Sequence, residues 1–137
     1  MKRRTRMTGW IAGAAIACLA VACLLAGAAA AAEIKPFEET AFEAAQAQDR
    51  AIVVEVMEQM CPPCRLQRTI LDGFYGLPEF ERLLVLQLDF RTQRELARKL
   101  KANSQSLLIA FKGRNEVARL VGETTPKYIG IFLRMTH

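Results

Sequence analysis

The spacing of apolar and polar residues predicts alternating helices and strands along most of the chain. Residues 51–57 are apolar on both faces apart from Glu55, a pattern typical of a strand at the centre of a covered sheet. Three more strands are predicted at residues 85–90, 106–111 and 116–121. Helices are predicted at residues 40–48 with Thr40 as N-cap, at 64–71, at 92–102, in a short stretch from Pro78, and from Pro126 through Leu133.

The predicted connections determine how these strands pair. Right-handed crossovers through helices make the first two strands parallel, and a tight turn at residues 112–115 makes the last two antiparallel. The sequence therefore predicts an α/β fold, a three-layer sandwich whose central mixed sheet of about four strands is flanked by helices.

Residues 1–32 have a different pattern from the rest of the chain. Basic residues cluster before position 7, and no charged residue occurs between Trp10 and Ala32, where the segment ends in a run of alanines. A basic start, an apolar stretch and small residues before a cleavage point are typical of a secretory signal peptide. The apolar stretch is also long enough for an uncleaved membrane anchor. We therefore assign residues 1–32 to a signal peptide or N-terminal anchor, and residues 33–137 to one domain.

The charge of the chain is concentrated in this leader. The full sequence has 19 basic and 14 acidic residues, a net charge of +5. Four of the basic residues and none of the acidic ones lie in residues 1–32, so the domain itself carries a net charge of +1. The domain has no basic run interleaved with aromatic residues, and we therefore expect no nucleic-acid partner.

Cys61 and Cys64 are the only cysteines of the predicted domain, because the other two lie in the leader. Two thiols separated by two residues can close into a small disulfide ring, and so short a loop gives little entropic stabilisation. The pair therefore indicates redox chemistry. Cys61 lies between a predicted strand and a predicted helix, where free N–H groups and the helix dipole favour a thiolate.

In this order of elements the sequence resembles the thioredoxin superfamily over nearly all of residues 37–135. The resemblance is carried by Cys61-Pro62-Pro63-Cys64 after a strand, Leu88-Asp89 closing the next strand, residues 107–113, and Val121-Gly122 before the last helix. It implies a thioredoxin-like fold in which Cys61 is the exposed attacking cysteine and Cys64 the resolving one.

Glu55 lies six residues before Cys61, where members of the superfamily carry a buried acidic residue that moves protons for the resolving cysteine. The residues themselves favour burial, because Glu55 shares its strand face with Val53 and Met57. Burial would raise the pKa of the carboxyl group and suit it to acid–base work. The alternative is an edge position in which the carboxylate reaches water.

Two departures from the superfamily pattern lie at the cysteine pair. Met60 replaces the tryptophan that usually precedes the first cysteine, so the predicted substrate-binding surface of Met60, Pro62 and Pro63 is apolar but lacks a ring. The Pro62-Pro63 pair contains no histidine to stabilise the thiolate, which argues against a strong oxidant. Arg65 and Arg68 either support the thiolate or are simply solvated.

A third departure lies at Ser106, which occupies the position of the usual cis-proline facing the cysteines. A non-proline cis bond costs roughly 3 kcal/mol, so we expect a trans peptide before Ser106 and an altered substrate groove. Gln105 and Ser106 are predicted to bind substrate through polar contacts, or else they simply begin a strand.

These features predict an exported thiol-disulfide oxidoreductase that reduces protein disulfides through Cys61 and Cys64, with Glu55 as proton acceptor and with no metal or other cofactor. The expected location is the periplasm, with attachment to the inner membrane if the leader is retained. The expected partners are a disulfide-bearing protein substrate and a membrane or periplasmic redox partner.

Two other functions are compatible with the sequence. One is a non-catalytic binding module that docks through Met60, Gln105 and Ser106. The other is a metal or cluster binder using the cysteine pair, although structural zinc needs four ligands and the domain offers two cysteines and His137.

Overall fold

The computed structural model describes residues 31–137. Its strands are β1 (Glu33–Pro36), β2 (Ala51–Met57), β3 (Leu84–Asp89), β4 (Leu107–Lys112) and β5 (Asn115–Val121). Its helices are α2 (Glu39–Ala47), α3 (Pro62–Tyr75), α4 (Arg94–Lys99) and α5 (Pro126–Arg134), with a 3₁₀ turn at Pro78–Phe80.

The strands form one mixed sheet in the order β1-β3-β2-β4-β5. Strands β2 and β3 are parallel, and β4 and β5 are antiparallel, which confirms the pairing predicted from the connections. Strand β2 is central, because it also pairs antiparallel with β4. The end of β2, the start of β4 and the end of β5 therefore lie at the same end of the sheet.

Strand β1 is a fifth strand where about four were expected. It lies at the edge of the sheet and pairs parallel with β3, from Glu33 beside Leu84 to Pro36 beside Gln87. Its side chains from Ile34 to Pro36 are exposed, so it contributes backbone hydrogen bonds and little apolar burial. An edge strand of this kind lacks the hydrophobic alternation that marks a strand in sequence.

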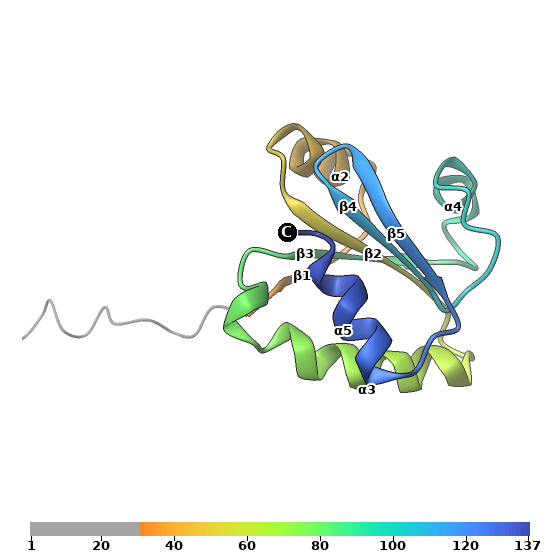
Figure 1. The fold of residues 1–137 in the computed structure, drawn as a ribbon. Coiled ribbons are helices and arrows are strands. Elements are labelled where there is room, and N and C mark those ends of the chain that lie inside the picture. Colours follow the sequence, from red (N-terminus) through yellow and green to blue (C-terminus); the bar gives the residue numbers. More distant parts are fainter. Residues whose placement is uncertain (1–30) are drawn as a thin grey trace, which may run out of the picture.

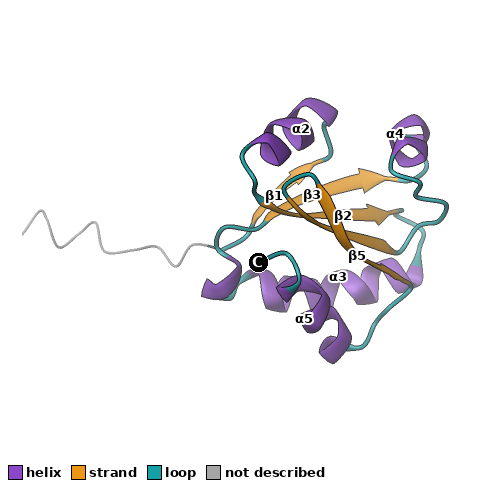
Figure 2. Ribbon diagram, turned by 45° about the horizontal axis from the view of Figure 1, so that its top comes forward, coloured by secondary structure: helices purple, strands orange, loops and turns teal. Residues whose placement is uncertain are grey.

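Helices cover both faces of the sheet, as Figures 1 and 2 show, with α2 and α4 on one side and α3 and α5 on the other. Side chains of β2 point alternately to the two faces of the sheet, so the strand contributes to the core on both sides. Ile52, Val54 and Val56 pack in the core under α2 and α4, whereas Val53 packs with Leu71 of α3 under the opposite layer. The predicted three-layer sandwich is confirmed.

Two helix boundaries differ from those predicted by a capping threonine and by a glycine. Helix α2 begins at Glu39 with Glu38 as its N-cap, so the assignment of Thr40 as N-cap is wrong. Helix α3 continues past Gly73 to Tyr75, because Leu71 and Tyr75 are buried on its inner face while Gly73 is exposed. The extra turn of α3 matters for the site, since Tyr75 lies on it.

The predicted leader lies outside the described residues, except for its last two positions. Ala32 packs against the core, and its N–H donates to the carbonyl of Tyr75 at 2.9 Å. Within residues 31–137, no helix is long and apolar enough to span a bilayer.

Candidate active site

Cys61 and Cys64 form a disulfide at the start of α3, with their Cα atoms 5.2 Å apart. Strand β2 ends at Met57, and a short turn leads to Cys61, which is the N-cap of α3. Pro62 and Pro63 occupy the first helical positions, where a missing N–H costs nothing. The Sγ of Cys61 accepts a hydrogen bond from the backbone N–H of Cys64 at 3.2 Å, so this sulfur lies at the positive end of the helix.

Both cysteines are shielded from solvent in this disulfide form, with Cys61 only 4% and Cys64 6% exposed. The expectation of an exposed Cys61 is therefore wrong here. The physical reason is the capping geometry, because the side chain turns back over the first turn of α3 instead of projecting outward. Met60 next to it is 82% exposed and is the most prominent apolar side chain at the pair.

Glu55 lies in the central strand β2 and is 2% exposed, which confirms the predicted burial and rules out the edge position. Its carboxylate has a different partner on each oxygen. The hydroxyl of Tyr75 donates to Oε1 at 2.7 Å, and the guanidinium of Arg68 forms an ion pair with Oε2. Burial raises the pKa of Glu55, and the Arg68 charge and the Tyr75 hydrogen bond oppose that rise without cancelling it.

Glu55 and Cys64 line the same small cavity, which also touches Gln67, Arg68 and Leu71. Its volume is about 10 Å³, at the lower limit for one water molecule. A polar cavity of this size between a carboxylate and a cysteine can hold a single water that relays a proton. The structure thus brings together the three residues predicted to be catalytic.

The predicted substrate-binding residues lie at the same edge of the sheet. Met60, Pro62 and Pro63 are exposed, Gln105 is half-buried, and Ser106 is only 4% exposed. The pairing of Val56 with Leu107 places Ser106 beside the end of β2, from which the chain continues to Cys61.

Ser106 has two unusual features. Its φ is +57°, in the left-handed region that residues other than glycine rarely adopt. Its buried Oγ has no hydrogen-bond partner within the described residues. No peptide bond in that part of the chain is cis, which confirms the trans peptide expected before Ser106. Strand β4 begins one residue later, at Leu107.

Three residues of the site were missed or misread in the sequence. Arg68 contacts Glu55 and not the cysteines, and Tyr75 had no assigned role. Their spacing on α3 carries a signal, because Arg68 follows Cys64 by four residues and Tyr75 follows Arg68 by seven, which are one and two helical turns and keep the three on one helix face. Val121 is 67% exposed and pairs with Leu107, so it adds a second apolar side chain at this edge.

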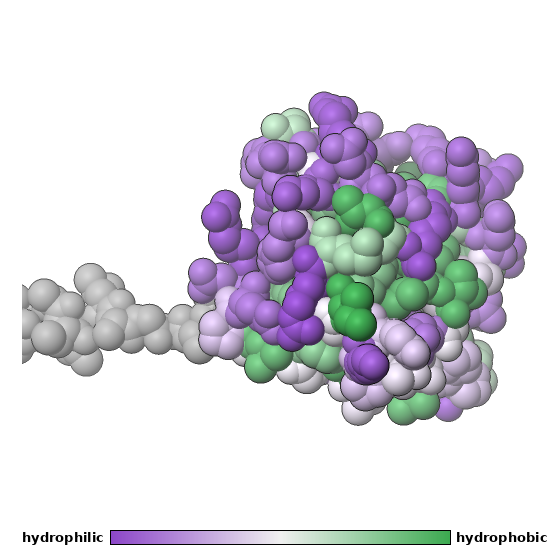
Figure 3. Space-filling view, viewed as in Figure 1, coloured by the Kyte–Doolittle hydropathy of each residue, from purple (hydrophilic) through white to green (hydrophobic). Residues whose placement is uncertain are grey.

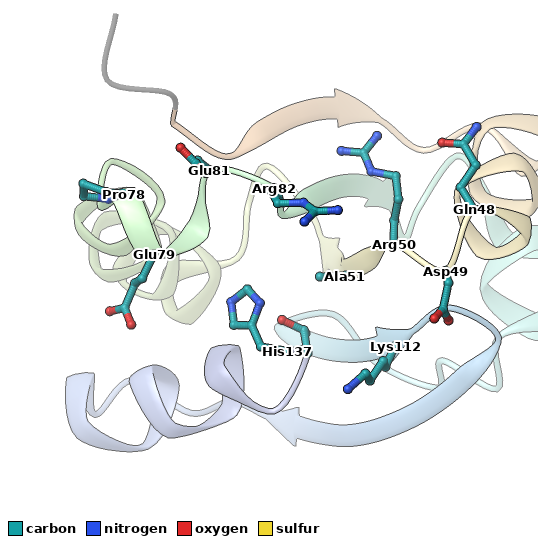
Figure 4. Close-up of a pocket in the computed structure, with 11 residues that line it drawn as sticks. Gln48, Asp49, Arg50, Ala51, Pro78, Glu79, Glu81, Arg82, Lys112 and His137 are labelled. Carbon is teal, nitrogen blue, oxygen red and sulfur yellow. The ribbon is translucent and has the colours of Figure 1, made fainter. Parts of the chain in front are cut away.

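Other hollows of the described residues lie away from the disulfide. A pocket of about 560 Å³ at the opposite end of the sheet is lined by residues of both charges around Ala51 and Lys112 (Figure 4). An apolar groove of about 460 Å³ lies between β5 and α5, where Figure 3 shows hydrophobic residues on the surface. Across residues 31–137, no three His, Cys, Asp or Glu side chains gather as a metal site would require.

The raised pKa of Glu55 has a consequence for stability. Because the folded state disfavours the ionised carboxylate, stability falls as pH rises from the ordinary glutamate pKa through the folded pKa, by about 1.4 kcal/mol for each unit between them. Glu55→Gln mimics the protonated acid. We therefore expect the oxidised variant and the oxidised wild type to be equally stable near about pH 4. At about pH 8 the variant should be the more stable of the two. Urea unfolding across this pH range measures the difference in stability. A difference that does not change with pH would contradict the prediction.

Comparisons with known proteins agree with the fold. No protein-family model matches the chain. Thioredoxin-1 of Saccharomyces cerevisiae is 31% identical over 84 residues, covering 59% of this chain and 77% of that protein. Thioredoxin-2 of the same yeast is 28% identical over 74 residues, covering 54% of this chain and 69% of that protein.

Solved structures show the same architecture. The crystal structure of Trxlp from Edwardsiella tarda has a TM-score of 0.72 and 32% identity, and the match covers 74% of this chain and 98% of Trxlp. Thioredoxin from Malassezia sympodialis has a TM-score of 0.67 at 14% identity, covering 77% of this chain and 93% of that one. The chain has a Cys-x-x-Cys disulfide at the start of α3 and a mixed sheet between two helix layers, and it is 31% identical to yeast thioredoxin-1 over 77% of that protein's length. It therefore belongs to the thioredoxin superfamily.

Proposed function

We propose that this protein-disulfide oxidoreductase acts after export, in the periplasm, and runs mainly in the reducing direction on disulfide-bearing proteins. The observation that carries the exchange chemistry of the proposal is the buried Glu55 carboxylate, which shares a cavity with Cys64 of the Cys61–Cys64 disulfide. Export and the periplasmic location rest on the pattern of residues 1–32, which also leaves open attachment to the inner membrane.

The reaction begins with the reduced protein. The Cys61 thiolate attacks one sulfur of a substrate disulfide, forms a mixed disulfide and releases the first substrate sulfur as a thiolate. The N-terminus of α3 stabilises the attacking thiolate, because the N–H of Cys64 points at the Cys61 sulfur.

The second step releases the substrate. Glu55 accepts the thiol proton of Cys64 through the shared cavity, directly or by way of one water. The Cys64 thiolate then attacks Cys61, closes the protein disulfide and releases the second substrate thiolate, which takes a proton from solvent. Two electrons pass from the dithiol to the substrate disulfide, and a membrane or periplasmic redox partner has to return them.

The surroundings of the thiolate support the reducing direction. A strong oxidant needs a reduced form that is strongly stabilised, and the Pro62-Pro63 pair supplies no histidine for this purpose. Stabilisation from the helix N-terminus alone favours a moderate potential. Substrate docks on the apolar surface of Met60, Pro62 and Pro63, with Gln105 and Ser106 beside the end of β2 that leads to the disulfide.

The reduction potential of the Cys61/Cys64 pair tests the direction. We expect a value near about −250 mV in glutathione and dithiothreitol buffers, at the thioredoxin end of the known range. A value above about −180 mV would assign the protein to oxidation or isomerisation instead.

Export is tested on the whole chain in a bacterial host. We expect the protein in the periplasmic fraction, with N-terminal sequencing showing cleavage close to Glu33, or in the inner membrane if the leader is retained. A control variant with the four leader cations replaced by glutamate should stay in the cytoplasm. Recovery of the unchanged chain in the cytoplasm would refute export without touching the redox chemistry.

A further inference from the structure

We propose that Arg68 is a positioning residue for this reaction, whose guanidinium favours ionisation of the Glu55 carboxylate and keeps it in place so that it can accept the proton of Cys64. The inference rests on the proposed function, because it takes Glu55 to be the proton acceptor. It adds a residue from α3 whose hydrogen bonds go to Glu55 and Met57 and not to the cysteine sulfurs.

The contacts of Arg68 fix its guanidinium on three sides. It forms an ion pair with Oε2 of Glu55, and its Nη2 donates to the Sδ of Met57 at 3.2 Å. With the Gln87 amide turned so that its oxygen faces Arg68, that oxygen accepts from Nη1 at 2.8 Å and from Nη2 at 2.7 Å. A fork held by a carboxylate, a thioether and an amide has little freedom to move.

Arg68 supplies the only positive charge that faces Glu55 among the described residues. From α3, the carboxylate also faces the Tyr75 hydroxyl, the Cys64 thiol position and the more distant charge of Asp72, which opposes ionisation. From β3 it faces the neutral Gln87, and from β4 its partner is the apolar Leu108. Without Arg68, Tyr75 would be the only remaining donor to the carboxylate within residues 31–137.

The position of Arg68 suits the role. Its side chain is 30% exposed while that of Glu55 is 3% exposed, so the cation keeps part of its hydration and still neutralises a buried anion. Arg68 follows Cys64 by one turn of α3, and both line the cavity with Glu55. Arg68 and Tyr75 occupy one lone pair on each carboxylate oxygen, which leaves acceptor capacity for the Cys64 proton.

The experiment isolates the step that needs Glu55. Reduced protein is mixed with dithiobis-nitrobenzoate, an aromatic disulfide that releases one coloured thiolate when Cys61 attacks and a second when Cys64 resolves the mixed disulfide. The rate of the second release is measured against pH. In parallel, the carboxyl carbon of Glu55 is titrated by NMR in the oxidised protein, where the cysteines carry no proton.

Arg68→Met should slow the second release by about tenfold at neutral pH and shift its pH profile upward, because a neighbouring cation typically lowers a carboxyl pKa by about 1–3 units. The Glu55 NMR titration should move the same way. Arg68→Lys, which keeps the charge, should restore most of both. The matched control is Arg65→Met, which removes a charge one turn earlier on α3 and should leave the Glu55 titration unchanged.

Each other outcome has a distinct meaning. A wild-type titration in Arg68→Met, or a slower release with no shift at any pH, would overturn the role of Arg68. If Arg68→Met does not fold, Arg68→Gln keeps an amide donor without the charge and is judged by the same two readouts. If Glu55→Gln leaves the second release unchanged, the proton acceptor of the proposed function is wrong, whereas the NMR titration still decides whether Arg68 favours ionisation of Glu55.

Discussion

Replacing Cys61 with serine should abolish turnover of protein disulfides, whereas replacing Cys64 should leave a protein that captures its substrate and cannot release it. The asymmetry follows from the order of the two thiols at the start of α3. Only Cys61 caps the helix and accepts the Cys64 N–H, so only its sulfur has the helix N-terminus to stabilise a thiolate. Cys64 lies deeper in the first turn, against the cavity shared with Glu55.

A disulfide-bearing protein incubated with each reduced variant tests this asymmetry. We expect Cys61→Ser to fall to the uncatalysed background, and Cys64→Ala to accumulate a covalent complex that dithiothreitol dissolves. Met60→Ser is the control, because it alters the exposed surface beside Cys61 and leaves both sulfurs. It should weaken substrate capture while retaining turnover. Covalent trapping by Cys61→Ser would reverse the assigned roles of the cysteines.

Most of the fold could be predicted because burial imposes periodicity on the elements that form the core. Strand β2 sends alternate side chains into two different cores, and both are apolar apart from Glu55. Strand β1 could not be found in this way, because its side chains are largely exposed and its pairing with β3 uses only backbone groups. Backbone pairing leaves no trace in side-chain pattern.

The site was predictable only as far as its residues lie close in sequence. Cys61 and Cys64 form a local motif, and Glu55 stands out as a charge in an apolar strand. The partners of Glu55 depend on how α3 packs across β2 and β3, and only its spacing of four residues from Cys64 separates Arg68 from a solvated arginine such as Arg65. Tyr75 was beyond reach for a further reason, since it lies past the glycine at which the helix was expected to end.

Ser106 is a different case. The sequence indicated that the residue matters for the site, but it did not indicate the backbone conformation of the residue. The missing proline predicted a trans peptide, which the structure has, but not the left-handed φ of +57°. That conformation costs an L-residue roughly 1–2 kcal/mol, and a buried hydroxyl without a partner costs about 1–3 kcal/mol more. Because both costs fall at the edge of the active site, we expect the residue to serve a function there.

Ser106→Gly should therefore stabilise the oxidised protein by about 1–3 kcal/mol, because glycine accepts the positive φ and removes the unpaired Oγ. Ser106→Pro should destabilise it by about 2–3 kcal/mol, since proline fixes φ near −65° and the Ser106 carbonyl would lose its 2.7 Å bond from the Gly122 N–H.

Urea unfolding measures both changes, with Lys101→Gly as the matched control. Lys101 has a φ of +52° but an exposed side chain, so its replacement relieves backbone strain alone and should gain less than Ser106→Gly. If the hydroxyl is reserved for substrate, Ser106→Gly will also raise KM for a protein disulfide while leaving kcat in place. Equal gains from the two glycine variants, with KM unchanged, would mean that the Ser106 hydroxyl carries neither cost nor function.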